Sequence, residues 1–339
     1  MVEKPVLEVK GLRVEIPIEG AVLRPVRGID LSVSRGETVA IVGESGCGKS
    51  LTALAIMGLL PRAARFSCER IALNGESLAD VSRRRWRQLR GDRIAMIFQD
   101  PMTALDPCYR VGDQMCEILQ QHRRISKSGA RERSLELLRK VGIPSPEERL
   151  SQFPHQLSGG LRQRVMIAMA LLCEPELIIA DEPTTALDVT IQAQILRLLR
   201  DIQRDTGIGL ILITHDLGVV AGMADRIVVM YGGEVGEVGS SDAVLGRPLH
   251  PYTEGMMRSI PVPGETKRGA MLGFIPGIVP RQTGERTQCG FIDRCPYAVA
   301  SCAAGAVALR DTGNGHAIRC IVPADQRDPE AWTRLAEAS

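Results

Sequence analysis

The octapeptide GESGCGKS at residues 43–50 constrains this chain more than any other feature of its sequence. It stands directly after the apolar run TVAIV and directly before the helical pattern SLTALAIMGLL. Glycines let such a loop fold around a polyphosphate so that successive backbone N–H groups point inward, and the helix N-terminus adds its positive end. We therefore predict a phosphate-binding loop in which Lys49 bridges the outer phosphates and Ser50 ligates Mg²⁺. The residues expected to contact the nucleotide here are Gly43, Glu44, Ser45, Gly46, Cys47, Gly48, Lys49, Ser50 and Leu51.

Length and charge limit the classes of protein that can surround this loop. The 339 residues suffice for roughly two domains at about 150 residues each. The chain carries 42 basic and 40 acidic residues, and this net charge of +2 argues against broad electrostatic capture of nucleic acid. Its longest apolar run, Val165 to Cys173, is shorter than the ~18 to 20 residues that a membrane-spanning helix requires. The first residues resemble neither a secretory signal nor a transit peptide, so we expect a cytoplasmic location.

Alternating strand and helix patterns indicate an α/β fold. Short apolar runs at 94–99, 177–181 and 210–214 are typical of buried strands, and helical spacing covers 162–172 and 191–205. Such alternation predicts a parallel sheet that helices cover on both faces.

Three further regions complete the predicted organisation. Residues 7–16 and 29–37 are expected to form two half-solvated strands, and Gly-Gly inside RIVVMYGGEVGEVG (226–239) predicts a hairpin closing the sheet edge. A helical insertion is expected over about residues 100–170, because 107–160 show amphipathic pieces and no buried strand. The composition changes again near residue 248, where a Pro- and Gly-rich segment leads into a region containing four of the nine cysteines.

Polar residues end several of the predicted strands. Asp181 and Glu182 end LIIADE, where a buried carboxylate pair is costly unless it binds something positive. In an enzyme with a phosphate loop that partner is Mg²⁺ at Asp181, while Glu182 orients or deprotonates the attacking water. His215 is a candidate for contact with the γ-phosphate, with a structural role as its alternative. Gln99 has a similar alternative as a solvent-facing strand end.

Taken together, these residues resemble the ATP-binding subunits of ABC transporters over about residues 6–245. The chain has a Walker A loop, Gln99 as the Q-loop, LSGGL (157–161) as the signature, a Walker B strand and His215 as the switch histidine, in the family's order. The resemblance implies an α/β P-loop NTPase, the ABC ATPase, with an antiparallel β subdomain and a helical subdomain. It implies ATP hydrolysis by Glu182 and His215, with Mg²⁺ held by Ser50, Gln99 and Asp181. The D-loop that it implies consists of Ala186, Leu187 and Asp188.

The resemblance also implies that one chain holds only half of each ATP site. In this family two nucleotide-binding domains enclose two ATP molecules head to tail, each held by one subunit's Walker A loop and the other's signature. Ser158 offers a hydroxyl, Gly159 and Gly160 permit close backbone approach, and the following helix points its positive end at the phosphate. Activity is therefore expected to require a dimer.

Two residues or segments depart from the family's pattern. Leu161 stands where the signature usually has Gln, which places a polar contact there in doubt. The early strand of the family offers an aromatic ring to adenine, but residues 14–26 contain none.

Weak discrimination between bases follows from the missing ring, because aromatic stacking contributes roughly 0.5 to 1.5 kcal/mol beyond burial. We predict that GTP is hydrolysed at a rate within about tenfold of the ATP rate. Steady-state rates with the two nucleotides test this, and a far larger preference for ATP would contradict it.

The C-terminal residues narrow the resemblance to one branch. HPYTEGMMRSIP (250–261), IPGIVP (275–280) and CGFIDRCPYAVASC (289–302) are similar to the extension of dipeptide, oligopeptide and nickel importer ATPases. The resemblance implies an ATPase at the cytoplasmic face of the inner membrane. Its implied partners are a second, related ATP-binding subunit, two transmembrane permease subunits and an extracytoplasmic solute-binding protein, with no specific nucleic acid.

Four cysteines in this extension suggest a metal site. Cys289, Cys295, Cys302 and Cys320 lack the close pairs of structural zinc sites, and four thiolates in a compact loop suit a [4Fe–4S] cluster, which similar importer subunits carry. Four reduced thiols that pack a small domain are one alternative, and zinc is another.

The sequence thus predicts an ABC nucleotide-binding domain over residues 1–247 and a small Cys-rich C-terminal domain over 248–339. The predicted function is that of the ATPase subunit of an importer of di- or oligopeptides or similar solutes. The alternative is a soluble ABC-type ATPase that acts on nucleic acid or ribosomes. Which solute is imported, and whether the ATPase pair is a heterodimer or a homodimer, stay open at this point.

Overall fold

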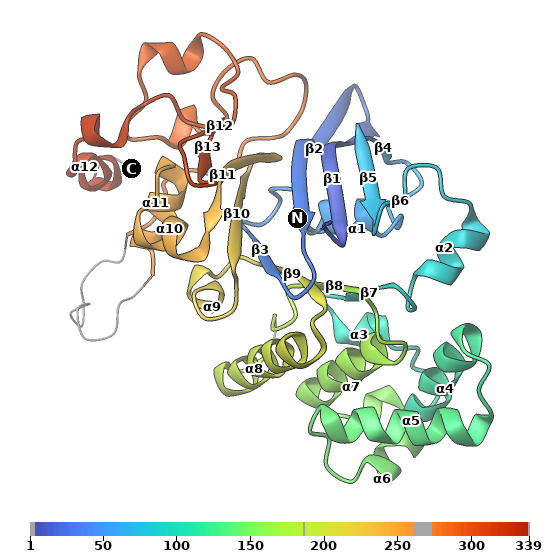
Figure 1. Cartoon of the computed structure of the whole chain (residues 1–339). Helices are drawn as coiled ribbons and strands as arrows, with labels where there is room; N and C mark the ends of the chain where they lie inside the picture. Colours follow the sequence, from blue (N-terminus) through green and yellow to red (C-terminus); the bar gives the residue numbers. More distant parts are fainter. Residues whose placement is uncertain (1–3, 186, 261–272, 338–339) are drawn as a thin grey trace. The chain divides into compact units, whose positions relative to one another are not determined.

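The computed structural model describes residues 4–185, 187–260 and 273–337, and it divides into two compact units (Figure 1). Unit 1 comprises the residues up to Glu8, Ser32–Thr38 and Ala72–Ile213. Unit 2 comprises Val9–Leu31, Val39–Ile71 and the residues from Thr214 onward. Among the described residues, none of the helices combines the length and the apolar composition that crossing a membrane demands.

Unit 1 is built around three parallel strands. They are β7 (Ile94–Ile97), β8 (Leu177–Asp181) and β9 (Gly209–Thr214), and β8 pairs with both others. Every residue of the three strands is buried, which explains why each one is a continuous apolar run in the sequence. Because parallel strands end at the same edge, residues that follow β7 and β8 are brought together there.

The helices of unit 1 include the predicted helical insertion. In Figure 1, α4 (Val111–His122), α5 (Lys127–Lys140), α6 (Pro146–Ser151) and α7 (Gly159–Leu171) gather into one group, and their contacts agree. The long helix α8 (Val189–Thr206) buries one face through Ile195, Leu199 and Ile202, which follow each other at helical spacing. Shorter elements of this unit are α2 (Arg83–Leu89), α3 (Pro101–Ala104) and the 3₁₀ turn Pro154–Gln156.

Unit 2 extends the strand β3 (Thr38–Val42) with a mixed sheet. β10 (Arg226–Tyr231) runs parallel to β3, and β11 (Glu234–Ser240) pairs with β10 as the predicted hairpin. Gly232 and Gly233 connect the hairpin strands with φ of +55° and +86°, a conformation that glycine adopts without strain. The prediction that this hairpin closes the sheet edge is wrong, because β13 (Ala317–Ile318) and β12 (Arg310–Asp311) continue the sheet beyond β11.

The early strands are antiparallel. β1 (Leu7–Ile18) and β2 (Ala21–Val33) are neighbours, and β4 (Arg65–Ser67) pairs with β1 so that Arg13 lies opposite Ser67. The second strand begins at Ala21, well before the predicted start at Ile29, because the ladder with β1 continues over the Pro-containing segment. The short strands β5 (Arg70–Leu73) and β6 (Glu76–Ser77) form a further antiparallel pair.

The C-terminal residues of unit 2 have little regular structure but a distinct apolar cluster. The helices are α9 (Leu217–Val220), α10 (Ser241–Gly246), α11 (Pro251–Arg258) and α12 (Ala331–Glu337), with 3₁₀ turns at Ile292–Arg294, Ala300–Ala303 and Ala324–Gln326. Three aromatic rings join this region to β10: Tyr231 lies 4.7 Å from Tyr252 and 5.0 Å from Phe291, between ring centroids. Only 3% of the chain is aromatic, so this grouping is a concentrated source of packing energy.

Candidate functional site

The predicted phosphate loop connects β3 to α1 (Lys49–Ile56) in unit 2. Gly43, Gly46 and Gly48 all have positive φ, of +153°, +81° and +102°. A β-carbon at Gly43 would lie 2.2 Å from the Met230 carbonyl oxygen, and one at Gly48 would lie 2.1 Å from the Pro25 carbonyl oxygen. Both positions therefore require glycine for backbone conformation and for space.

Lys49 is held inside its own loop. Its side chain is 5% exposed, and Nζ donates hydrogen bonds to the carbonyl oxygens of Gly43, at 2.7 Å, and Glu44, at 3.0 Å. Thr52 secures the next turn by donating from Oγ1 to the Gly48 carbonyl at 3.0 Å. Ser45 and Gly46 are exposed at the tip of the loop, whereas Cys47 is fully buried beneath it, and that burial raises the pKa of its thiol. The loop thus offers an ammonium group and accessible backbone to an anionic ligand.

Three distant residues also contact the loop, and the sequence analysis missed all three. The Tyr252 hydroxyl accepts a hydrogen bond from the Glu44 N–H at 2.7 Å, and Gln282 Nε2 donates to the Gly46 carbonyl at 2.7 Å. Arg294 forms two hydrogen bonds with the Glu44 carboxylate, at 2.7 and 3.0 Å. They lie more than 200 residues from the loop in the sequence, so no spacing pattern could have revealed them.

In unit 1 the structure brings together Asp181, Glu182 and Gln99. Asp181 ends β8 and is 5% exposed, and Glu182 follows it with φ of +45°, a strained value for a residue with a β-carbon. One carboxylate oxygen of Glu182 accepts hydrogen bonds from Gln99 Nε2 at 3.2 Å and from Thr185 Oγ1 at 2.9 Å. The Glu182 N–H donates to the Ile213 carbonyl at 2.9 Å, which extends the β8–β9 ladder by one bond. Thr185 is a further contact that the sequence analysis missed.

The predicted signature and D-loop residues also lie near one another in unit 1. Ser158 caps α7 by accepting the Leu161 N–H at 3.4 Å, and Asp188 caps α8 by accepting the Ile191 N–H at 3.0 Å. A β-carbon at Gly160 would lie 3.0 Å from Ile191 Cγ2. At Gly159 it would lie 3.6 Å from Leu187 Cδ2. Two predicted positions, Ala186 of the D-loop and Pro261 at the end of the HPY segment, lie outside the described residues.

His215 belongs to unit 2, like the phosphate loop, whereas the carboxylates and the signature belong to unit 1. His215 is exposed between β9 and α9. The next turn is ordered by Thr214, whose hydroxyl accepts the Asp216 N–H at 3.1 Å, and by Asp216, which caps α9.

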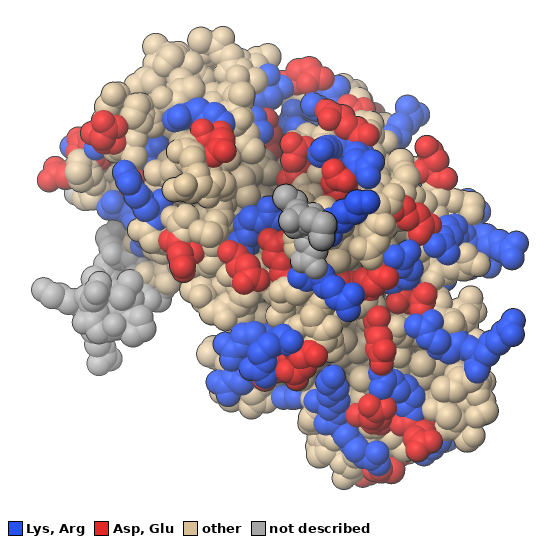
Figure 2. Space-filling model, viewed as in Figure 1, with Lys and Arg blue, Asp and Glu red and all other residues tan. Residues whose placement is uncertain are grey.

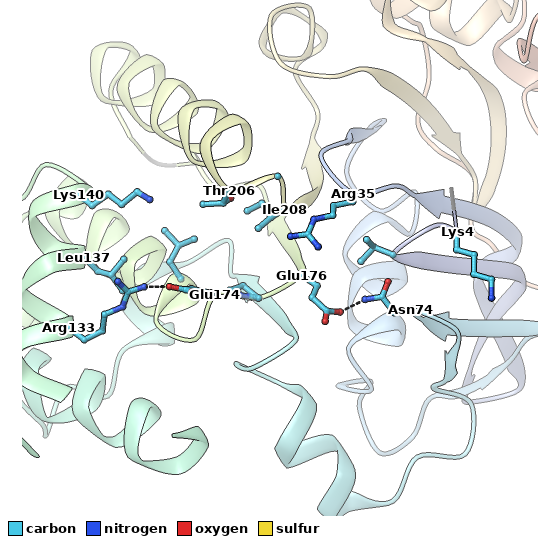
Figure 3. A pocket seen from close by; sticks show the side chains of 14 residues that line it. Lys4, Arg35, Asn74, Arg133, Leu137, Lys140, Glu174, Glu176, Thr206 and Ile208 are labelled. Atoms are coloured by element: carbon cyan, nitrogen blue, oxygen red, sulfur yellow. Dashed lines mark hydrogen bonds and ion pairs between the residues drawn. The ribbon is translucent and has the colours of Figure 1, made fainter. Parts of the chain in front are cut away.

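A separate cavity of about 470 Å³ opens in unit 1 (Figure 3). Its labelled cationic side chains include Lys4, Arg35 and Lys140, and Arg133 forms an ion pair with Glu174 at 2.7 Å. Its described lining contains none of the residues predicted for nucleotide binding or catalysis, so we assign this cavity no part in the ATP site.

Comparison with known proteins decides the family. Two family models match the chain, "ABC transporter" over residues 26–185 and "Oligopeptide/dipeptide transporter, C-terminal region" over residues 237–302. The dipeptide transport ATP-binding protein DppD of Bacillus subtilis (strain 168) is 49% identical over 327 residues, which are 96% of this chain and 97% of that protein. The chain belongs to the ABC transporter ATP-binding family. DppD of Escherichia coli (strain K12) is 48% identical to this ABC ATPase over 319 residues, 94% of this chain and 97% of that protein.

Solved structures agree with this membership. A dimeric ATP-binding cassette bound to ADP and phosphate matches with a TM-score of 0.63 at 27% identity, covering 69% of this chain and 98% of that chain. The cbiO1 protein of Clostridium perfringens, part of an ABC transporter complex, matches with a TM-score of 0.60 at 30% identity, covering 72% and 92%. The predicted α/β ABC ATPase fold with an antiparallel sheet and helices is confirmed, whereas a separate Cys-rich C-terminal domain is not confirmed.

The predicted [4Fe–4S] cluster is wrong. Cys289, Cys295, Cys302 and Cys320 do line one cavity, but its volume is about 10 Å³, the room of about one water molecule. Among the described residues, no three His, Cys, Asp or Glu side chains are placed to hold a metal ion, and the relatives are named simply as ATP-binding transport proteins. The cysteines instead pack in the apolar cluster of unit 2, where burial raises the pKa of the Cys295 thiol to about 12 and favours its protonated form.

Proposed function

We propose that this ABC ATPase energises the import of dipeptides or short peptides across a cell membrane. One observation carries the proposal. The chain matches dipeptide transport ATP-binding proteins at 48–49% identity over more than nine-tenths of its length, and the match includes the oligopeptide-type C-terminal region. This C-terminal region distinguishes the ATPases of peptide importers from ABC ATP-binding proteins in general.

The residues of unit 2 suit the binding of the ATP phosphates. Lys49 holds a buried positive charge beside the loop, and the exposed backbone at Ser45 and Gly46 leaves space where a β-carbon at Gly46 would meet nothing within 4 Å. In the proposed site, the loop from Gly43 to Leu51 binds the phosphates, and Ser50, Gln99 and Asp181 hold Mg²⁺. When bound, Mg²⁺ neutralises charge on the phosphate oxygens.

The residues of unit 1 suit the orientation of water. Glu182 is the proposed catalytic carboxylate, because it follows the buried Asp181 at the end of β8 and accepts hydrogen bonds from Gln99 and Thr185 that orient its carboxylate. A carboxylate fixed in this way can accept a proton from a water molecule aimed at the γ-phosphate. His215 is proposed to contact that phosphate. Ser158, Gly159 and Gly160 are proposed to act on the ATP of a second subunit, next to the D-loop residues Leu187 and Asp188.

ABC importer cassettes work as dimers together with transmembrane permeases. For this chain we propose a related ATP-binding subunit as the second cassette, two permease subunits and an extracytoplasmic solute-binding protein. The place of action would be the cytoplasmic face of the inner membrane. The rival function, on nucleic acid or ribosomes, has less support. The net charge is only +2, and Figure 2 shows acidic and basic side chains interspersed over the visible face.

Reconstitution of the whole transporter tests the proposal. The chain is co-produced with its candidate permeases and second cassette, placed in lipid vesicles, and assayed for ATP hydrolysis and uptake of labelled dipeptide. We expect hydrolysis to rise when the binding protein and a dipeptide are added together, and a Lys49→Ala variant to lose both activities. Retention of the chain on nucleic acid, with no stimulation by any peptide, would contradict the proposal.

A further inference from the structure

The Glu44 carboxylate is fixed by a guanidinium group from the C-terminal region. Arg294 meets Glu44 through both terminal nitrogens, at 2.7 and 3.0 Å, in the two-pronged geometry that gives the strongest carboxylate pairs. The Arg294 side chain is 5% exposed and that of Glu44 is 33% exposed, so solvent screens this pair less than an ion pair on the open surface.

Arg294 is itself held in place. Its Nε donates to the Pro276 carbonyl at 2.8 Å, and a terminal nitrogen donates to the Ile275 carbonyl at 3.0 Å. The guanidinium carbon lies 5.7 Å from the centre of the Tyr231 ring. Because the guanidinium group is anchored on its far side, its two bonds to Glu44 can define a position for the loop.

The loop backbone is held by further bonds, one from the Gly233 N–H to the Cys47 carbonyl at 3.1 Å and two with the C-terminal region. Gln282 donates to the Gly46 carbonyl, and Tyr252 accepts the Glu44 N–H, both at 2.7 Å. A peptide unit is planar, so a bond that fixes the Gly46 carbonyl also fixes the direction of the Cys47 N–H, which in this structure donates to the Glu44 carbonyl at 3.3 Å. Gly46 has positive φ and no atoms where a β-carbon would lie, so side-chain packing does not restrain it.

These contacts matter because a phosphate loop works through the directions of its backbone N–H groups. A glycine-rich loop has many accessible conformations, and a ligand that must order it loses affinity. A loop already fixed in one conformation avoids that cost. The three contacting residues, Tyr252, Gln282 and Arg294, are here called the clasp.

We propose that the C-terminal region acts as part of the nucleotide site, with Arg294 and Gln282 as positioning residues that hold the phosphate loop ready for ATP. The inference rests on the proposed role of residues 43–51 in ATP binding. Loss of the clasp weakens ATP binding, and the rate at saturating ATP stays close to that of the original protein.

The test measures ATP affinity on the full chain and KM and kcat in the reconstituted transporter. Arg294→Gln and Gln282→Ala should each raise the dissociation constant and the KM for ATP about tenfold, the effect of losing one charged or well-oriented hydrogen bond. In both variants kcat should stay within about twofold, because the catalytic carboxylate is untouched. Arg294→Lys should restore part of the affinity, and Glu44→Gln combined with Arg294→Gln should be no weaker than Arg294→Gln alone.

Arg319→Gln is the matched control. Arg319 lies in the same region and donates to the carbonyls of Val235, at 2.9 Å, and Val307, at 2.7 Å, and neither residue belongs to the loop. Equal losses of ATP affinity in Arg319→Gln and Arg294→Gln would contradict the proposed role of the clasp. They would mean that any such change in the C-terminal region loosens the structure and weakens ATP binding. Unchanged affinity in Gln282→Ala with an unchanged melting temperature would overturn it as well, even where Arg294→Gln does not fold. A Lys49→Ala variant that binds ATP normally would instead refute the phosphate-loop assignment itself.

Discussion

The phosphate loop of unit 2 and the carboxylate group of unit 1 are held in different ways. The loop is fixed by buried or half-buried bonds with Tyr252, Gln282 and Arg294, partners that are 208 to 250 residues away in the sequence. The Gly233 N–H also donates to the Cys47 carbonyl at 3.1 Å. Glu182 is held by the amide of Gln99, in an exposed hydrogen bond, and by its near neighbour Thr185. Its backbone is also strained.

We interpret this difference as a division of roles between the phosphate loop, which binds ATP, and Glu182, which acts in its hydrolysis. A loop that is fixed in advance costs little to order when the nucleotide arrives, whereas the hydrogen bonds to Glu182 set the direction in which its carboxylate meets the attacking water. We therefore expect changes in the loop to alter ATP affinity and stability, and changes at Glu182 and Thr185 to alter the rate alone.

The largest expected effect tests the carboxylate side of this comparison. Glu182→Gln should lower kcat by about 100-fold or more, because the amide cannot take a proton from water. ATP affinity should change by less than about threefold, since the loop contacts lie elsewhere. Single-turnover hydrolysis and equilibrium binding of ATP measure the two quantities. Turnover at the original rate would exclude Glu182 as the catalytic base.

The next effect tests the loop side through two matched glycine changes. Gly48→Ala places a β-carbon 2.1 Å from the Pro25 carbonyl oxygen, so we expect a loss of about 3 kcal/mol in the free energy of unfolding and loss of ATP binding. Gly46→Ala also strains a positive φ but meets open space, and should cost about 1 kcal/mol. Denaturant unfolding of both variants compares them. Equal costs would show that crowding at Gly48 is unimportant.

A smaller effect is expected from changes in the two side chains that donate hydrogen bonds to Glu182. Thr185→Val should lower kcat about tenfold with unchanged ATP affinity, because it removes one bond that orients the carboxylate. Gln99→Ala should lower kcat about as much and also weaken ATP binding, because Gln99 is a proposed ligand of Mg²⁺ as well. Thr185→Ser keeps the hydroxyl and serves as the control. If Thr185→Val weakened ATP binding as much as it slowed turnover, the separation of the two regions would be lost.

The smallest effect concerns thiol chemistry and extends the comparison to the apolar cluster of unit 2. Burial raises the pKa of Cys295 to about 12, so at pH 8 this thiol is protonated and unreactive. Cys108 in unit 1 is exposed. Brief treatment with iodoacetamide followed by mass spectrometry should find label on Cys108 and little on Cys295. Rapid labelling of Cys295 in the folded protein would show that the cluster is open to solvent.

The sequence predicted the parts whose signals are local. The strands at 177–181 and 210–214 and the turn at Gly232 and Gly233 are confirmed, because continuous apolar runs and paired glycines define them without reference to distant residues. The phosphate loop could be found for the same reason. Its spacing reflects backbone geometry that only glycine allows.

The parts that failed depend on tertiary contacts. The second early strand begins at Ala21 because β1 pairs with it, which no alternation in 21–28 could indicate. The four cysteines suggested a metal cluster by their spacing, but the space between them is filled by the packing of the apolar cluster. The bonds from Gln282 and Arg294 to the loop join segments with no local pattern in common.

The separation of 250 residues between Glu44 and Arg294 also orders events during synthesis. At about 5 to 20 residues per second, a ribosome needs roughly 10 to 50 seconds to add Arg294 after Glu44 has been made. Until then the loop residue Glu44 lacks its guanidinium partner, although Gly233, Tyr252 and Gln282, which also bond to the loop, have already been made. If the clasp has its proposed role, a nascent cassette at this stage binds ATP about tenfold more weakly than the full chain does.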